Sequence, residues 1–423
     1  QLNNLEGMAN QLGNLGLVYG KTGETSQALM YFNEAYEIYK KINNALGIAS
    51  ELGNIGIIYM KEGEMNKALE YCEQAYNIDT KINNVRGMIA DLSNIAYIYK
   101  EKGDLKATIE YYKKIYELHK QLDNVQRMVE VLETIIKTYR IIGNLKKQLE
   151  YSQYKFEIHE KANNLQGKAE TLMNMGLIQL DSGHPKTALE HLQEAYDIYK
   201  QLKDLEGMAN QLGNMGLIYT RMNEYDKALE QFKRSYEFHE QVNNLKGMGA
   251  VLGNIGALYL DIRQPNKALE HLERAYAIHQ KTNNLQGMAN ALGNMGFIHK
   301  QMEKREKSLE YFKKSYEINK KLNNIKGMST ILRSMGLLYM KQERWDEAEE
   351  KYNEAIELNP KDASARYNLA CIFSLKQEKS LMLQNLERAI VLDNKYKKMA
   401  KEDEDFRHFW TDGEFISLTD TGE

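Results

Sequence analysis

The sequence predicts an all-α fold, an α-solenoid in which antiparallel helix pairs stack into a right-handed superhelix. A pattern of 40 residues recurs nine times between residues 1 and 360 without insertion or deletion. Within each copy, apolar residues recur at three- and four-residue spacing, which is typical of amphipathic helices. No strand-like alternation of apolar and polar residues precedes any copy. Repeated units of this kind bury their apolar faces against their neighbours.

Each copy is expected to contain two helices, here called helix A and helix B. Helix A begins after a pair of asparagines such as Asn43 and Asn44, one of which is a natural N-cap. It ends near a turn glycine, and these glycines are Gly23, Gly63, Gly103, Gly143 and Gly183. Helix B begins at positions such as Pro185 and Pro265, because proline is tolerated in the first turn of a helix. Each copy is therefore predicted to be a helical hairpin.

Composition excludes several classes of protein. The chain has 423 residues and a formal net charge of −3, so no bulk charge favours nucleic acid or an anionic membrane as partner. No apolar run approaches the roughly 18 residues of a membrane span. The two cysteines, Cys72 and Cys371, lie far apart and in no metal-like spacing. We therefore expect a cytoplasmic protein without disulfide, metal or cofactor.

The first copy carries Leu15, Gly16, Tyr19, Gly23, Ala28, Phe32 and Ala35. In this spacing of large, small, aromatic and turn residues, the chain resembles the tetratricopeptide repeat (TPR) family. The family's usual repeat has 34 residues. The longer repeat here resembles the branch that includes kinesin light chains and bacterial and archaeal scaffold proteins. The resemblance implies a protein-interaction function with no enzymatic activity.

Domain boundaries follow from the period. Residues 1–360 are expected to form nine hairpins, of which those in 81–160 diverge in sequence, and 361–395 to form one 34-residue repeat. Residues 396–423 would be a capping helix and an acidic tail. Its aromatic residues, Phe406, Phe409, Trp410 and Phe415, are expected to cover the last helix pair, and a partner-binding tail is the alternative. The chain starts in the phase of a helix end, so a preceding segment is expected to be missing.

Glycines interrupt helix A, and a phosphate-binding loop would need a preceding strand that the sequence lacks. Seven of them occupy the family's small position, where helix A is expected to approach the alanines of its own helix B: Gly16, Gly56, Gly176, Gly216, Gly256, Gly296 and Gly336. Gly13 and Gly20 extend this stripe in the first copy, which predicts an inner wall almost free of side chains.

Asparagine recurs two residues before the small position, at what we call the asparagine position: Asn14, Asn54, Asn94, Asn174, Asn214, Asn254, Asn294 and Asn368. In this family that position points into the concave groove. The resemblance of the chain to peptide-clamp members of the family implies that these asparagines contact the main chain of a ligand. An amide offers both a donor and an acceptor, as main-chain recognition requires. The alternative is that each asparagine bonds a neighbouring helix and sets the angle between repeats.

Cationic residues on the same face would select acidic or mixed-charge peptides: Lys21, Lys61, Lys100, Lys137, Arg140, Arg221, Lys300 and Lys341. Among these we predict peptide contacts for Lys61, Lys100, Arg140 and Arg221. The alternative is that they are solvated helix ends.

Other polar residues recur in the phase of the repeat and are expected to be structural. His119, His159, His239 and His279 share a late helix B position, and Cys72 takes the position of Phe32 as a core thiol. His299 replaces a packed tyrosine. No catalytic or metal-binding set is predicted.

The third and fourth copies depart from the pattern. Arg127, Glu133, Thr134 and Ile136 replace Gly, Gly, Asn and Gly, and Lys155 replaces an alanine. Larger residues at helix contacts must change the packing of the helices. We expect a local change of superhelical pitch within 81–160, either as a hinge or as the place where a specific partner is read.

The sequence thus favours a scaffold that binds an extended peptide or a partner helix in its concave groove. One alternative is the regulatory or sensor region of a larger protein whose effector domain is absent. Another is a structural solenoid that assembles end to end through an uncapped N-terminal hairpin.

Overall fold

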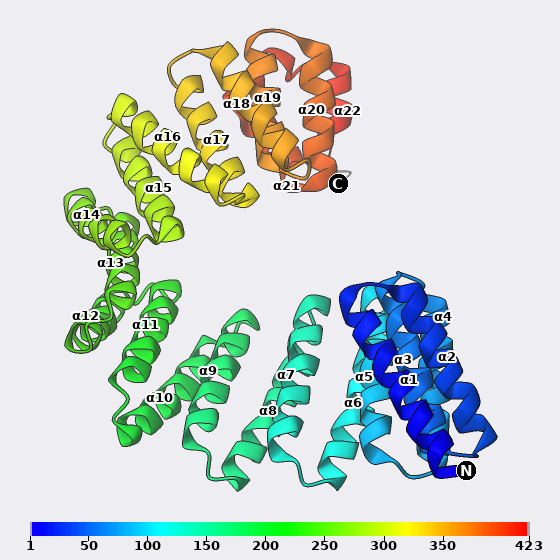
Figure 1. The fold of residues 1–423 in the computed structure, drawn as a ribbon. Coiled ribbons are helices and arrows are strands. Elements are labelled where there is room, and N and C mark those ends of the chain that lie inside the picture. Colours follow the sequence, from blue (N-terminus) through cyan, green and yellow to red (C-terminus); the bar gives the residue numbers. More distant parts are fainter. Residues whose placement is uncertain (1, 421–423) are drawn as a thin grey trace. The chain divides into compact units, whose positions relative to one another are not determined.

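The computed structural model describes residues 2–420 and is helical throughout, with 22 α-helices, one 3-10 helix and no strand among these residues. Consecutive helices pack as antiparallel pairs, which confirms the predicted α-solenoid (Figure 1). The chain divides into two compact units, Gln1–Ile198 and Tyr199–Glu423. None of the described helices combines the length and the apolar character needed to cross a membrane.

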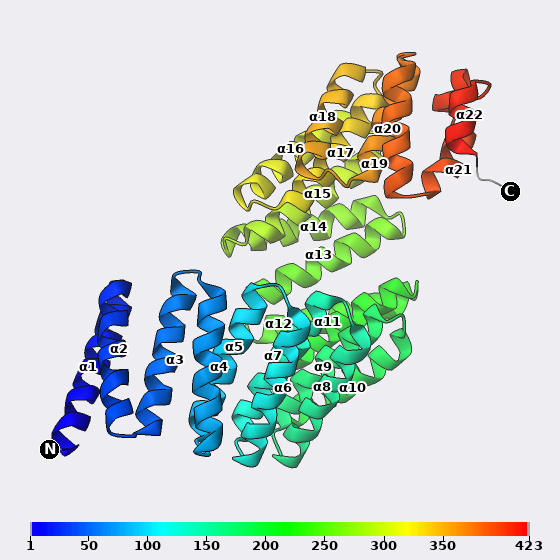
Figure 2. The same cartoon turned by 90° about the vertical axis from the view of Figure 1, so that its right-hand side faces the viewer.

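The first unit contains five hairpins, and Figure 2 shows the first of them as a row of neighbouring helices. Its helices are α1 (Leu2–Thr22), α2 (Thr25–Lys41), α3 (Ala45–Lys61), α4 (Met65–Lys81), α5 (Val85–Glu101), α6 (Leu105–Gln121), α7 (Val125–Ile142), α8 (Leu145–Lys161), α9 (Leu165–Asp181) and α10 (Pro185–Leu202), the last of which contains the boundary between the units.

The second unit continues the alternation of helix A and helix B. Its helices are α11 (Leu205–Arg221), α12 (Tyr225–Gln241), α13 (Leu245–Asp261), α14 (Pro265–Lys281), α15 (Leu285–Gln301), α16 (Arg305–Lys321), α17 (Ile325–Met340), α18 (Trp345–Leu358), α19 (Ala363–Leu375), α20 (Lys379–Leu392), α21 (Lys395–Glu402), η1 (Glu404–Phe409) and α22 (Gly413–Thr419).

The paired asparagines have two different tasks at the turn from helix B to helix A. The first adopts a left-handed backbone, with φ of 53° at Asn43 and at Asn243, and ends helix B. The second caps helix A, since the Asn244 side chain accepts a hydrogen bond from the backbone N–H of Gly247 at 2.9 Å. The same cap recurs at Asn44, Asn124, Asn164, Asn284 and Asn324. The predicted helix starts are therefore confirmed.

The turn from helix A to helix B needs a residue of positive φ. Gly23, Gly63, Gly103, Gly143 and Gly183 fill this position with φ between 78° and 90°. Later copies place Asn223, Arg263, Glu303 and Glu343 there at φ of 56° to 59°. Pro185 and Pro265 are the first residues of α10 and α14, as expected.

The glycine at the small position allows helix A to approach helix B, but its main neighbour differs from the one predicted. A Cβ added at Gly16 or Gly216 would lie 2.6 Å from the ring of Phe32 or Phe232. The large residue of helix B therefore occupies the space, and the expected alanine contributes a carbonyl oxygen in some copies, such as Ala68 at 3.3 Å from a Cβ at Gly56. Glycine is needed here because the ring fills the volume of its missing side chain.

The prediction of a bare inner wall is wrong. A Cβ at Gly13 would meet the carboxylate of Glu51 at 2.7 Å, and one at Gly20 would meet Ile58 at 3.0 Å. Both neighbours belong to α3, the helix A of the next copy. Gly13 and Gly20 are buried, so the stripe serves packing between repeats.

The C-terminal segment covers the last hairpin. Ala370 and Ala389 are fully buried between α19 and α20, as expected for small positions of the shorter repeat. Phe406 and Phe415 are also buried, and Phe409 and Trp410 pack partly buried against the same core. These aromatic rings cover the apolar core of the last hairpin.

Candidate functional site

The eight predicted asparagines lie in the middle of successive A helices, four in each unit. Asn14, Asn54, Asn94 and Asn174 belong to α1, α3, α5 and α9, and Asn214, Asn254, Asn294 and Asn368 to α11, α13, α15 and α19. Asn14 is exposed and the other seven are half-buried. We call each set of four an asparagine row.

Two of these side chains have partners within the chain. The Asn54 amide donates to Glu51 at 3.4 Å in its own helix, and Asn368 hydrogen-bonds Tyr352 of α18. Among residues 2–420, no side-chain hydrogen bond is found for Asn14, Asn94, Asn174, Asn214, Asn254 or Asn294. These amides retain both donor and acceptor for a ligand.

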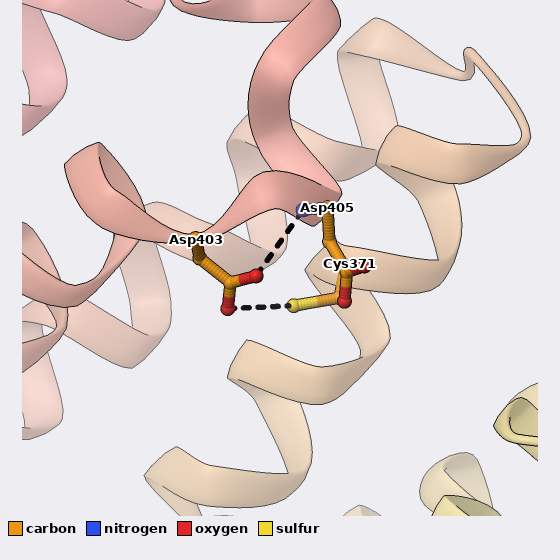
Figure 3. A group of neighbouring side chains, drawn as sticks. All are labelled: Cys371, Asp403 and Asp405. Atoms are coloured by element: carbon orange, nitrogen blue, oxygen red, sulfur yellow. Dashed lines mark hydrogen bonds between the residues drawn. The ribbon is translucent and has the colours of Figure 1, made fainter.

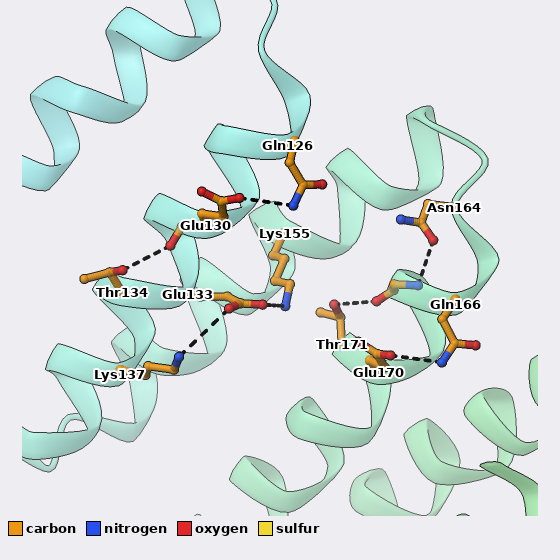
Figure 4. Close-up of polar contacts among 11 residues, drawn as sticks. Gln126, Glu130, Glu133, Thr134, Lys137, Lys155, Asn164, Gln166, Glu170 and Thr171 are labelled. Carbon is orange, nitrogen blue, oxygen red and sulfur yellow. Dashed lines mark hydrogen bonds and ion pairs between the residues drawn. The ribbon is translucent and has the colours of Figure 1, made fainter. Parts of the chain in front are cut away.

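The first row is interrupted at α7. Thr134 occupies the asparagine position, and its hydroxyl donates to the backbone oxygen of Glu130 at 3.1 Å (Figure 4). Beside it, the buried Lys155 of α8 forms a 2.6 Å ion pair with Glu133, which also lies 4.0 Å from Lys137. The interactions of this stretch are therefore internal salt bridges and helix hydrogen bonds.

The predicted cationic contacts have different surroundings. Lys61 donates through Nζ to the backbone oxygen of Gly20 at 2.7 Å near the C-terminal end of α1, so this exposed lysine already has one partner within the chain. Lys100 and Arg140 are exposed near the ends of α5 and α7. Arg221 is the last residue of α11. Burial and the neighbouring Lys341 lower the pKa of Lys300.

Sequence reasoning missed a group of buried acids in the first unit. Glu51 and Asp91 share one helix A position and are 4% and 5% exposed, and Asp79 is 4% exposed. Burial raises the pKa of Glu51 to about 7. The pKa of Asp91 is raised to about 8, mainly by burial and then by the charge of Asp79. The sequence did contain a signal for these buried acids. Other copies place an apolar residue at the position of Glu51 and Asp91, namely Val131, Val251 or Ile331.

Models of the tetratricopeptide repeat match residues 8–45, 47–123, 207–281, 287–361 and 351–391. One of these models alone matches more than half of the chain. The chain belongs to the tetratricopeptide repeat family. Residues 124–206, which include most of the divergent fourth copy, lie outside these matches. No curated protein sequence matches the TPR chain.

Solved structures share the fold at low identity. Aspartyl phosphate phosphatase F from Bacillus subtilis is 15% identical, covers 84% of this chain and 94% of its own, and superposes with a TM-score of 0.51. The apo form of RapI is 14% identical and covers 84% and 98%, with a TM-score of 0.53. A kinesin light chain with nearly identical TPR-like repeats, from Podospora anserina, is 14% identical over 46% and 96%, with a TM-score of 0.40. The first two similarities concern the fold alone.

The recurring histidines belong to the packing between TPR copies. His159, His239 and His279 lie buried over Gly167, Gly247 and Gly287, where a Cβ would overlap the imidazole. Burial is the main cause that lowers their pKa.

Two further predictions concern single core residues. Cys72 is fully buried, and burial raises its pKa to about 12, which confirms a core thiol. His299 is packed as expected and stacks on Tyr311 at 5.1 Å between ring centroids.

Cys371, Asp403 and Asp405 place one possible ligand atom each within 4.8 Å of one another (Figure 3). Asp403 already accepts hydrogen bonds from the Tyr367 hydroxyl at 2.7 Å, the Asp405 N–H at 3.2 Å and the Cys371 thiol at 3.9 Å. Burial and the two aspartates raise the pKa of Cys371. The cluster therefore ties η1 to α19 through a protonated thiol and a bonded carboxylate.

Proposed function

We propose that this TPR chain is a non-enzymatic protein-interaction scaffold whose asparagine rows bind an extended peptide or a partner helix. The observation that carries the proposal is the set of six asparagines that keep unbonded amides at one repeated position. Asparagine is a mediocre helix former, so its repeated use in the middle of a helix needs a compensating role. Hydrogen bonds to a ligand's main chain would supply that role.

Each row acts within its own unit. Each row has asparagine in three consecutive copies and is then interrupted, by Thr134 in the first and by Ser334 in the second. The second row is the better candidate, because its three consecutive amides, Asn214, Asn254 and Asn294, are all unbonded among residues 2–420, whereas Asn54 in the first row donates to Glu51. A ligand held by main-chain contacts would be recognised with little dependence on its side chains. Exposed Lys100 and Arg140 add a preference for acidic residues in the first unit.

The test is a selection of peptides from a displayed random library on the intact protein. The variant Asn214→Ala, Asn254→Ala, Asn294→Ala should lose the peptides that the wild type selects, by about tenfold in affinity or more. A matched variant, Asn266→Ala with Asn353→Ala, removes exposed asparagines of helix B and should keep them. Helix content and melting temperature of both variants are measured first. Retention of the peptides by a folded triple variant would overturn the proposal.

A second candidate function, self-assembly, is favoured by the outer face of α1. Leu15 and Val18 are 43% and 56% exposed, whereas Ile55 and Ile58 at the same positions of α3 are 1% and 3% exposed. An apolar face of this kind marks an interaction surface. Sedimentation over a range of protein concentrations tests it: assembly should occur, should be lost in Val18→Glu and should persist in Val391→Glu, a change at an exposed valine of α20. A wild type that stays monomeric throughout would exclude this candidate.

A further inference from the structure

A cavity of about 770 Å³ lies between α6, α7 and α8, within the first unit. Its floor is apolar and buried, and consists of Met128, Leu132 and Ile135 of α7. Tyr116 of α6 and Tyr154 of α8 belong to its walls. The volume is within the range of ligand sites, and no member of the asparagine row lines it.

The cavity lies at the one junction between copies where arginine replaces glycine near the start of helix A. At the other junctions the late helix B side chain fills the space of that missing Cβ, as Tyr39 does over Gly47. Arg127 has a Cβ where the other copies have none, so the late helix B residue of this junction, His119, cannot pack over that position as Tyr39 does. The Arg127 guanidinium itself is exposed and pairs with Glu130 of its own helix at 2.7 Å. This junction contributes four of the residues that line the cavity: Lys120, Asp123, Val125 and Met128.

Tyr154 is exceptional among the copies. Its position on helix B is otherwise polar or charged: Glu34, Gln74, Lys114, Glu194, Arg234, Arg274, Lys314 and Glu354. Here it is an aromatic ring, 44% exposed and packed edge-on against Tyr151 at 5.6 Å between centroids. Two tyrosine walls over an apolar floor suit a flat or cationic group.

The wall around Tyr116 is acidic. Glu117 and Glu157 line the cavity. Burial, and then the charges of Glu117, Glu157 and Tyr154, raise the pKa of Tyr116, and no cation is among these influences. Lys113 lines another part and is bonded to Glu110 at 2.8 Å.

Two further cations stand at the rim. Lys120 lies 3.9 Å from Glu117 with both side chains about 60% exposed, and Lys161 is exposed at the end of α8. Both can extend into water. The part of the cavity lined by Tyr116, Tyr154 and Glu157 therefore favours a positive charge.

We propose that this cavity is a second recognition site, which takes an arginine or lysine side chain of a partner protein. The aliphatic stem would cover Met128 and Leu132, and the cationic head would lie between Tyr116 and Tyr154 beside Glu157. The inference rests on the proposed interaction function and adds a site that is independent of the asparagine rows.

The experiment is saturation-transfer NMR on the intact protein with N-acetyl-arginine methylamide as probe. The citrulline analogue has nearly the same shape and no charge, and is the ligand control. Wild type should bind the arginine probe at millimolar concentration and the citrulline analogue about tenfold more weakly. Glu157→Gln, which keeps the shape of the wall, should reduce arginine binding by a similar factor.

Two more variants separate the cavity from general surface charge. Arg127→Gly restores the residue of the other copies, should close the cavity and should abolish binding while the protein stays folded. Glu237→Gln changes the same repeat position in the sixth copy and should bind as the wild type does. Equal binding of both probes, no binding of the arginine probe, or unchanged binding by Glu157→Gln would each overturn the proposal. The asparagine triple variant should bind the probe normally, so a failure here is distinct from a failure of the asparagine rows.

Discussion

The glycine at the small position illustrates how a single missing side chain sets the packing of a hairpin. Its replacement by a larger residue in α7, Ile136, coincides with the divergent copy. The glycines differ widely in the space around them. A Cβ at Gly216 would lie 2.6 Å from the Phe232 ring, whereas nothing lies within 4 Å of one at Gly253.

Gly216→Ala should therefore destabilise the protein by about 1–3 kcal/mol, because the Phe232 ring has to move. Gly253→Ala is the matched control in the next helix A and should be neutral or stabilise by up to about 1 kcal/mol, since alanine is the better helix former. The free energy of unfolding of both variants, measured by urea denaturation, tests this difference. Equal effects of the two substitutions would show that the Phe232 ring does not need the space at Gly216.

The buried acids predict a pH dependence. Glu51 and Asp91 have ordinary pKa values of 4.5 and 3.8, raised in the folded chain to about 7 and 8. The native state holds protons that the unfolded chain has released, so their contribution to stability declines as pH rises from their ordinary values through about 7 and 8. Asp91 and Asp79 share a side-chain hydrogen bond. Asp91→Asn should remove part of this decline, because an amide does not ionise and can donate to Asp79 as the protonated carboxyl does.

The measurement is the free energy of unfolding between about pH 5 and pH 9. Relative to wild type, Asp91→Asn should gain at least about 1 kcal/mol toward the alkaline end. Asp123→Asn, which introduces the asparagine of other copies at an exposed position, serves as control. Parallel pH curves for Asp91→Asn and wild type would show that Asp91 is ionised when folded.

Residue roles that depend on local backbone geometry could be predicted from the sequence. The asparagine caps, the turn glycines and the core thiol of Cys72 are of this kind. The contacts of Lys61 and of the Gly13 stripe could not be predicted, because the residues they meet belong to an adjacent copy. Their surroundings depend on how α3 stacks on α1, and the repeat pattern does not specify that angle.

At the scale of the helix, the caps of helix A provide the clearest prediction. Asn244→Ala removes the acceptor of the Gly247 N–H and should cost about 1 kcal/mol of stability. Asn243→Gly, at the adjacent residue with φ of 53°, should be neutral or slightly stabilising. Thermal unfolding of the two variants compares them directly. A larger loss in Asn243→Gly would mean that the two asparagines have been assigned the wrong tasks.

For the divergent helix α7, the sequence predicts the helix but not the cavity beside it. The existence and bounds of this helix follow from the 40-residue period. The larger residues at its helix contacts also indicated that it packs differently from the other A helices. The cavity beside it could not be predicted, because it depends on how α6 and α8 pack on this helix. Tyr154, an aromatic residue at an otherwise polar position, was the signal in the sequence.

At the scale of the molecule, the TPR hairpins within each unit pack mainly on their neighbours in sequence, so the two units need not unfold together. Both tryptophans, Trp345 and Trp410, lie in the second unit. The buried acids Glu51 and Asp91 weaken only the first unit at alkaline pH. Around pH 9 we expect circular dichroism to lose signal at lower urea than tryptophan fluorescence does, and around pH 5 the difference should shrink. Coincident transitions at both pH values would show that the chain unfolds as one cooperative unit.

We propose that the asparagine rows hold the main chain of a ligand. The most direct measurement is the affinity of a peptide selected on the wild type, compared with versions methylated on single backbone nitrogens and with single alanine variants. N-methylation at several positions should weaken binding by about tenfold or more, while most alanine substitutions should have little effect. Loss on alanine substitution with tolerance of N-methylation would contradict the claim, because the chain would then read side chains.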